Sequence, residues 1–138
     1  MTPYDTMTDG IVSYLDNGLD TAEVVAEPSE FGLSDRDEVG VRLDSESAVE
    51  DVMGSPEPYL TTLRYHLTCV SFSPDGMREA VRKRNELVMA VRNLLSADRT
   101  MGGILLVSQL VGIDFDSAPV DTGYFAAAII EMNVIMRA

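Results

Sequence analysis

The chain has 138 residues, a formal net charge of −13 and a hydrophobic content of 46%, so we expect a single globular domain spanning residues 1–138. No apolar run is long enough to cross a membrane and the first residues do not form a secretory leader, which predicts a protein made in the cytoplasm without membrane contact. The single cysteine, Cys69, excludes an internal disulfide framework, and the scarcity of bases argues against sequence-independent nucleic-acid binding.

The negative charge is concentrated in the first 58 residues. Met1–Pro58 holds fifteen acids against two arginines, whereas Tyr59–Ala138 holds eight acids and eight bases. Lys83 is the only lysine. This composition resembles that of proteins from salt-accumulating haloarchaea, because ~1 M salt cuts the Debye length to ~3 Å and crowded acids then repel little. A mesophilic acidic protein from a high-GC genome, with arginine in place of lysine, is the alternative.

The first periodic segment predicts a helix over Pro3–Leu19. Thr2 can cap this helix, Pro3 suits its first position, and Asn17-Gly18 can end it. Its apolar residues recur at helical spacing on one face: Tyr4, Met7, Ile11, Tyr14 and Leu15.

Two short strands are predicted next, over Thr21–Ala26 and Glu38–Leu43, because apolar and polar residues alternate in the second. The acidic segment Asp44–Pro58 is rich in Ser and Pro, which predicts a long exposed loop or arm, with a helical turn over Ala48–Met53 as an option.

Part of this region has the spacing of a calcium-binding loop. Asp35, Asp37, Gly40 and Glu46 fall on positions of such a loop, but Val39 replaces one ligand and no helices flank the segment. We therefore interpret it as the start of a strand and expect no metal site.

The neutral half begins with a long strand. In YLTTLRYHLTCVSF the residues Leu63, Tyr65, Leu67 and Cys69 alternate with polar ones, which is typical of a strand with one buried face. Ser73-Pro74 can then cap a helix that runs to about Ala97. Its apolar stripe contains Met77, Ala80, Val81, Leu87, Val88, Val91, Leu94 and Leu95, and its other face carries Arg78, Arg82, Lys83 and Arg92.

Two strands close the chain, over Ile104–Phe115 and Tyr124–Arg137, with the turn-rich linker DSAPVDTG between them. The order of elements predicts an α+β fold in which an antiparallel sheet packs on one long amphipathic helix plus an N-terminal helix, with a long acidic loop. Unpaired groups on the sheet edges make such a sheet a natural assembly surface.

None of the candidate catalytic or cofactor-binding motifs has the residues that its chemistry requires. His66 is the only histidine and points away from Cys69 on its strand, so the two cannot pair; we expect a solvated or interface histidine and a buried thiol. Asp114 and Asp116 share one side of a strand end, where solvated carboxylates are the simpler interpretation. Met101-Gly102-Gly103 lacks the Lys and Ser/Thr of a phosphate loop. We expect no catalytic residue, no cofactor and no enzyme activity.

The layout resembles the tail terminator and head-to-tail joining proteins of tailed viruses. The resemblance is carried by YLTTLRYHLTCVSFSPDGMREAVRKRNELVMAVRNLL and by GYFAAAIIEMNVIMRA, in which a Tyr-Phe pair opens a small-residue strand. It covers Tyr59–Ala138, and the first half only by the order of its elements. The acidity suggests a haloarchaeal virus or provirus.

The resemblance implies a structural virion protein located in the tail or neck. Copies of the chain would form a ring, commonly a homohexamer, that caps the tail tube and contacts a neck or connector protein, with DNA passing the lumen without specific binding. Other neck connectors, namely stopper or tail completion proteins, and a stand-alone cytosolic α+β binding module remain as alternatives.

Two surfaces are candidates for the contacts of such a ring. The helix bases Arg78, Arg82, Lys83 and Arg92 are candidate subunit-interface residues that would meet acids of the adjacent copy. The acidic arm over residues 44–58 is a candidate contact with the tail tube or the neighbour through Glu46, Glu50, Asp51, Met53 and Glu57. A head-to-tail ring needs two different surfaces on each copy, which an exposed sheet edge and the basic helix face would supply.

Overall fold

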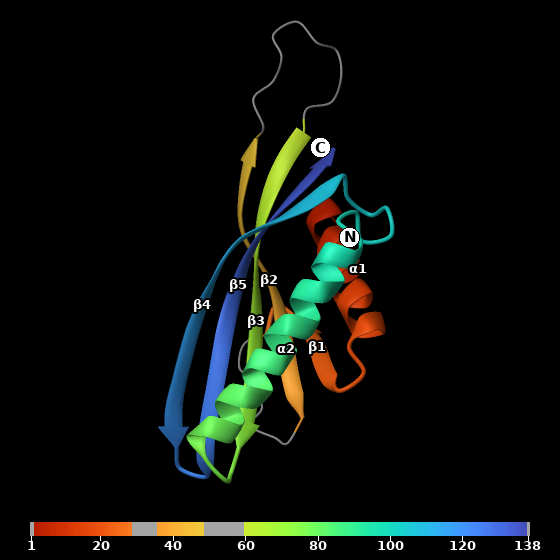
Figure 1. Ribbon diagram of the computed structural model, residues 1–138. Helices are drawn as coiled ribbons and strands as arrows, with labels where there is room; N and C mark the ends of the chain where they lie inside the picture. Colours follow the sequence, from red (N-terminus) through yellow and green to blue (C-terminus); the bar gives the residue numbers. More distant parts are fainter. Residues whose placement is uncertain (1, 29–35, 49–59, 138) are drawn as a thin grey trace, which may run out of the picture.

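Figure 1 shows the computed structural model of the chain, which describes residues 2–28, 36–48 and 60–137. Its elements are α1 (Pro3–Gly18), β1 (Ala22–Ala26), β2 (Asp37–Ala48), β3 (Leu60–Ser73), α2 (Met77–Ala97), β4 (Val107–Val120) and β5 (Gly123–Arg137). Two helices and a five-stranded sheet make an α+β fold, so the predicted fold class is confirmed.

The strands form one sheet in the order β1-β2-β3-β5-β4. The pairs β2–β3, β3–β5 and β4–β5 are antiparallel, as expected from the sequence. The pair β1–β2 is parallel, with Ala22 opposite Asp37 and Ala26 opposite Val41. The sheet is therefore mixed, because the chain returns to the starting end of β1 before it enters β2.

Both helices pack on the same face of the sheet. Figure 1 shows α2 crossing the sheet diagonally, with α1 beside it. On β3 the alternation seen in the sequence places Leu63, Tyr65, Leu67 and Cys69 in the core, each with no exposed surface. Buried Thr8 of α1 and Tyr65 share a hydrogen bond of 2.8 Å between their hydroxyls, so α1 is tied to the centre of the sheet.

The start of α1 is predicted correctly from the sequence, whereas the start of α2 is not. α1 begins as expected: the Thr2 hydroxyl accepts from the Asp5 amide and the Asp5 side chain accepts from the Thr2 amide, a reciprocal cap. The expected cap of α2 by Ser73 is wrong. Ser73 belongs to β3, where it pairs with Tyr124, and its hydroxyl accepts from the Asp75 amide at 3.1 Å. α2 consequently starts at Met77.

The first part of the predicted acidic loop is strand. β2 continues to Ala48, after an irregularity between Leu43 and Ser45, because its second half pairs with β3 from Thr61 to Arg64. Residues 49–58 of the predicted loop lie outside the described residues.

β4 also extends further than the sequence indicates. Asp116–Val120, assigned to a linker, continue the strand by pairing with β5, and the turn shrinks to Asp121 and Thr122. At its other end β4 starts at Val107. The preceding residues form turns, in which Met101, Gly102 and Gly103 have positive φ of 49°, 75° and 89°.

Candidate assembly surface

The outer face of α2 is an exposed surface of mixed chemistry. Arg78, Arg82 and Arg92 are exposed there, and Met89 between them keeps 49% of its surface exposed. Arg82 Nη2 lies 2.7 and 2.9 Å from the two carboxylate oxygens of Glu79. The same face holds a shallow groove of about 700 Å³, and the residues that line it are Arg78, Val81, Arg82, Asn85, Glu86, Met89, Ala90 and Asn93. Three of the four predicted interface bases, Arg78, Arg82 and Arg92, are thus exposed on this face, and their role in a subunit interface stays a prediction.

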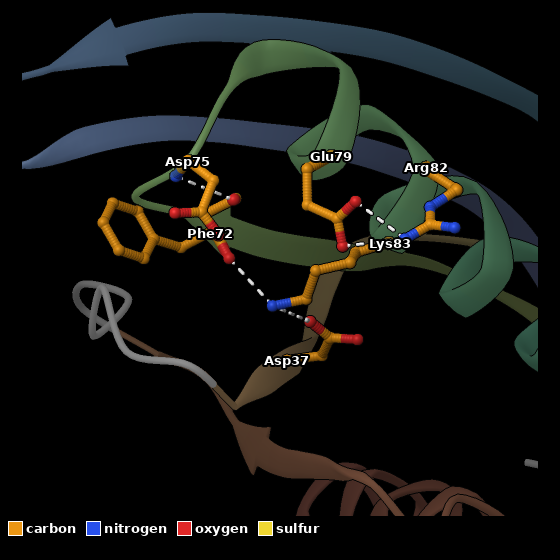
Figure 2. Close-up of polar contacts among 7 residues, drawn as sticks. Asp37, Phe72, Asp75, Glu79, Arg82 and Lys83 are labelled. Atoms are coloured by element: carbon orange, nitrogen blue, oxygen red, sulfur yellow. Dashed lines mark hydrogen bonds and ion pairs between the residues drawn. The ribbon is translucent and has the colours of Figure 1, made fainter.

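Lys83, the fourth predicted interface base, points elsewhere. As Figure 2 shows, its ammonium turns toward β2 and β3, away from the Glu79–Arg82 pair. Lys83 Nζ donates to the Phe72 carbonyl at 2.8 Å and lies 3.8 Å from Asp37 Oδ1. Three-quarters of the Lys83 side chain is covered, since only 25% of it is exposed. Lys83 therefore joins α2 to the sheet within the chain.

The carboxylate opposite Lys83 is in an unfavourable environment. Partial burial raises the pKa of Asp37, while Ser71 and the Lys83 ammonium act in the opposite direction. Asp37 Oδ1 and Ser71 Oγ are both buried without a hydrogen-bond partner among the described residues. Lys83 is thus the charge that compensates a poorly solvated carboxylate.

Arg84 is a basic residue whose burial our sequence analysis did not predict, although its spacing from Ala80 and Val88 places it on the apolar stripe of α2. Only 8% of Arg84 is exposed. Its guanidinium carbon lies 4.8 Å from the centre of the Phe115 ring, and Nη1 donates to the Asp116 carbonyl at 3.1 Å. These contacts attach α2 to β4 by a cation–π interaction and a hydrogen bond.

The second face of the sheet carries the histidine. His66 Nε2 lies 3.5 Å from Glu131 Oε1 and 3.8 Å from Asp44 Oδ2. Next to it, Arg64 Nε donates to Asn133 Oδ1 at 3.3 Å. Among the described residues no nucleophile is seen in contact with His66. Cys69 is buried on the opposite side, where burial raises the pKa of its thiol to about 12. These residues form polar contacts between neighbouring strands.

The structure describes part of the predicted acidic arm. Glu46 lies in β2, where it accepts hydrogen bonds from the Tyr4 hydroxyl at 2.9 Å and the Thr61 hydroxyl at 3.0 Å, so it braces α1 and β3. The remaining arm residues, Glu50, Asp51, Met53 and Glu57, lie outside the described residues.

The segment that resembled a calcium loop is a strand. Asp37, Gly40 and Glu46 lie along β2 and Val39 is buried, while Asp35 lies outside the described residues. Within the described ranges no three His, Cys, Asp or Glu side chains gather as a metal would require. Asp114 and Asp116 are both exposed on β4. No helix in the described part of the chain has the length and apolarity of a membrane span.

Comparisons with known proteins do not identify a family for this chain. No family model matches the chain, and no curated protein matches it. A solved chain from the "Virion of native gene transfer agent (GTA) particle" is similar with a TM-score of 0.34 and 10% identity, covering 99% of this chain and 92% of that one. This likeness is too weak to define fold or function.

Proposed function

We propose that the protein is a structural virion protein that forms a ring, the tail terminator that joins a tail tube to the neck of a tailed virus. The proposal rests on the resemblance of Tyr59–Ala138 to such proteins, together with one feature of the described residues. Each copy presents two different exposed surfaces, the acidic α1 and the outer face of α2 with its arginines, and a head-to-tail ring requires two different patches.

The two helices carry the complementary charges. α1 contains three acids and no base, whereas the outer face of α2 presents three arginines beside two acids, because Lys83 and Arg84 turn toward the sheet. Asp9 and Asp16 of α1 are exposed, as are Arg78 and Arg82 of α2. A contact between the α2 face of one copy and α1 of the next would pair these groups.

Apolar residues on α2 would stabilise this contact between copies at high salt concentration. Charge pairs at exposed positions contribute little and are screened at high ionic strength. Val81 and Met89 lie beside the arginines in the groove, so burying them adds a component that salt does not screen.

The experiment measures the mass of the purified chain by light scattering over a series of salt concentrations. We expect a ring, and we expect Arg78→Glu combined with Arg82→Glu to reduce it to smaller species. Adding Asp9→Arg and Asp16→Arg should restore the ring by exchanging the charges. Arg42→Glu is the matched control, because Arg42 is an exposed arginine of β2.

A chain that stays monomeric under all conditions would favour the stand-alone binding module. Labelling particles with an antibody to this chain separates the remaining alternatives. Label at the junction of tail tube and neck supports a terminator, and label on the capsid side of the neck supports a stopper or another connector.

A further inference from the structure

The helix layer leaves part of β4 uncovered. α1 packs chiefly on β1 and β2, and α2 packs chiefly on β3 and β5. β4 forms the flank of the sheet, as Figure 1 shows. α2 reaches it through the contacts of Arg84 with Phe115 and Asp116. The helix-side face of β4 is therefore partly open.

Three apolar residues of β4 face this open side. Leu110, Ile113 and Phe115 lie opposite β5 residues that are buried under the helices, and directly opposed residues of an antiparallel pair share one face of the sheet. The irregularity between Leu110 and Gly112 allows this, because Val111 has no partner in β5 and the alternation of faces starts again after it. Leu110 and Phe115 keep 40% and 55% of their surface exposed, and Ile113 is half-buried. We call these three residues the β4 strip.

No acid of β4 shares the face of the strip. Asp114 and Asp116 alternate with Ile113 and Phe115, so their side chains lie on the second face of the sheet. The strip is therefore separated from these negative charges by the sheet itself.

Three arginines of α2 and the turn after it border the β4 strip instead. The guanidinium carbon of Arg84 lies 4.8 Å from the centre of the aromatic ring in the strip. Arg99 and Ser96 line a cavity of about 150 Å³ that Leu110 also lines, and Arg92 lies one helical turn before Ser96. Arg92 and Arg99 are exposed. Within the described part of the chain, none of the three arginines forms an ion pair with a carboxylate.

This combination of apolar and basic groups indicates the kind of partner. In a second copy, α1 and α2 turn their apolar faces to their own sheet, so neither offers a free apolar helix face. Packing the strips of two copies together would bring the arginines of both copies next to each other, and like charges at an interface are destabilising. A helix of another protein with acids beside its apolar face fits both the strip and the arginines.

The length of the strip sets the length of that helix. Leu110 and Phe115 are separated by about four regular strand steps and the extra residue Val111, which gives a span of about 13 Å. A helix covers this span with about nine residues, because it rises by about 1.5 Å per residue. Apolar residues on one face of such a helix, three or four positions apart, would contact Leu110, Ile113 and Phe115.

We propose that the β4 strip and the arginines beside it bind an acidic amphipathic helix of another protein, which lies next to α2 and extends the helix layer over β4. This goes beyond the proposed ring, whose contact uses α1 and the outer face of α2 around Arg78 and Arg82. The strip lies on the flank of α2 that faces β4, so both contacts can form on the same copy.

Peptide binding to the full chain tests the proposal. The probe is a fluorescein-labelled helical peptide of about four turns, with leucine on one face and glutamate on both flanks of that face. Its matched control carries lysine in place of every glutamate. Fluorescence anisotropy is measured at the lowest salt concentration at which the chain stays folded, because salt screens the charges. We expect the glutamate peptide to bind at least about tenfold more tightly than the lysine peptide.

Two pairs of variants locate the binding site. Leu110→Gln should weaken binding of the glutamate peptide about tenfold, whereas Ile129→Gln should leave it unchanged, because Ile129 is 38% exposed but lies on the second face of the sheet. Arg92→Glu should weaken it as well, whereas Arg78→Glu on the outer face of α2 should not, which separates this site from the ring. The melting temperature of each variant shows that it is folded.

Equal binding of the two peptides, or equal losses for Leu110→Gln and Ile129→Gln, would overturn the proposal. Light scattering without peptide adds a second criterion. A mass that falls with Leu110→Gln but not with Ile129→Gln would assign the strip to a contact with a second copy, and the proposal would again be wrong.

Discussion

Replacing Lys83 by methionine tests whether this residue holds α2 on the sheet. Methionine retains most of the apolar stem but removes the ammonium that donates to the Phe72 carbonyl at 2.8 Å and lies 3.8 Å from Asp37 Oδ1. The variant leaves Asp37, whose side chain is 16% exposed, without this compensating charge. The Phe72 carbonyl loses the hydrogen bond from Lys83 as well.

The size of the effect follows from this partial burial. Removing one partner of a fully buried ion pair costs ~3–5 kcal/mol, whereas an exposed pair contributes at most ~1 kcal/mol. The pair of Lys83 and Asp37 lies between these limits, so we expect the free energy of unfolding to fall by about 2 kcal/mol at neutral pH. For a domain of this size the melting temperature should fall by about 8 °C.

The loss should depend on pH with a definite sign. The folded-state pKa of Asp37 is raised by burial, so ionising this group lowers the free energy of unfolding as pH rises from the ordinary carboxyl pKa to the folded one. Without Lys83 that pKa rises further, and the destabilisation extends to higher pH. The loss caused by Lys83→Met should therefore be larger at pH 7 than at pH 4.

Urea denaturation of wild type and variants at the two pH values measures this directly. The double variant Lys83→Met with Asp37→Asn should recover most of the loss at pH 7, because the carboxylate is then absent. An equal loss at both pH values, or no recovery in the double variant, would refute the assignment of Lys83 to this contact.

Three further predictions concern other parts of the chain. Gly123→Ala should lower the free energy of unfolding by ~1–3 kcal/mol, because the added Cβ would lie 2.6 Å from the Ser73 carbonyl oxygen. Gly112→Ala is the control: its Cβ would meet nothing within 4 Å, so the same urea titration should show no change. Cys69 should resist a thiol reagent at pH 8 in the native state and react once the protein unfolds, since burial raises its pKa to about 12; rapid native labelling would contradict this. The melting temperature should rise from low to multimolar salt as the acids of the first 58 residues are screened, and equal stability across the series would contradict the halophilic interpretation.

Side-chain periodicity made the central elements predictable. The alternation along β3 and the apolar stripe of α2 both report burial against one covered face, and the structure confirms each. The ends of the strands were harder to predict from the sequence, because the residue at which a strand ends depends on the strand that pairs with it. Asp44–Ala48 and Asp116–Val120 are rich in turn-forming or acidic residues, yet they remain strand because β3 and β5 lie beside them.

The candidate surface was predictable only in part. Helical spacing groups Lys83 with Arg82, but the rotation of α2 on the sheet decides that Lys83 faces Asp37 and Arg82 faces outward. The parallel pairing of β1 has no local signal either, since the same short strand satisfies both directions. The exposure of Phe115 depends on which strand forms the edge, which alternation does not specify.

The position of β5 between β3 and β4 has a consequence for folding kinetics. β4 and β5 are joined by a turn at Asp121 and Thr122, so this hairpin can form from neighbouring residues in microseconds. Pairing of β3 with β5 must instead close a loop that contains α2 and all of β4. We expect this long-range closure to limit the folding rate to the range of milliseconds to seconds. Until it occurs, β3 has an open edge on the side where β5 belongs. Stopped-flow refolding should therefore be slowed in its main phase by substitutions in β3 and β5, and not by substitutions in the hairpin turn.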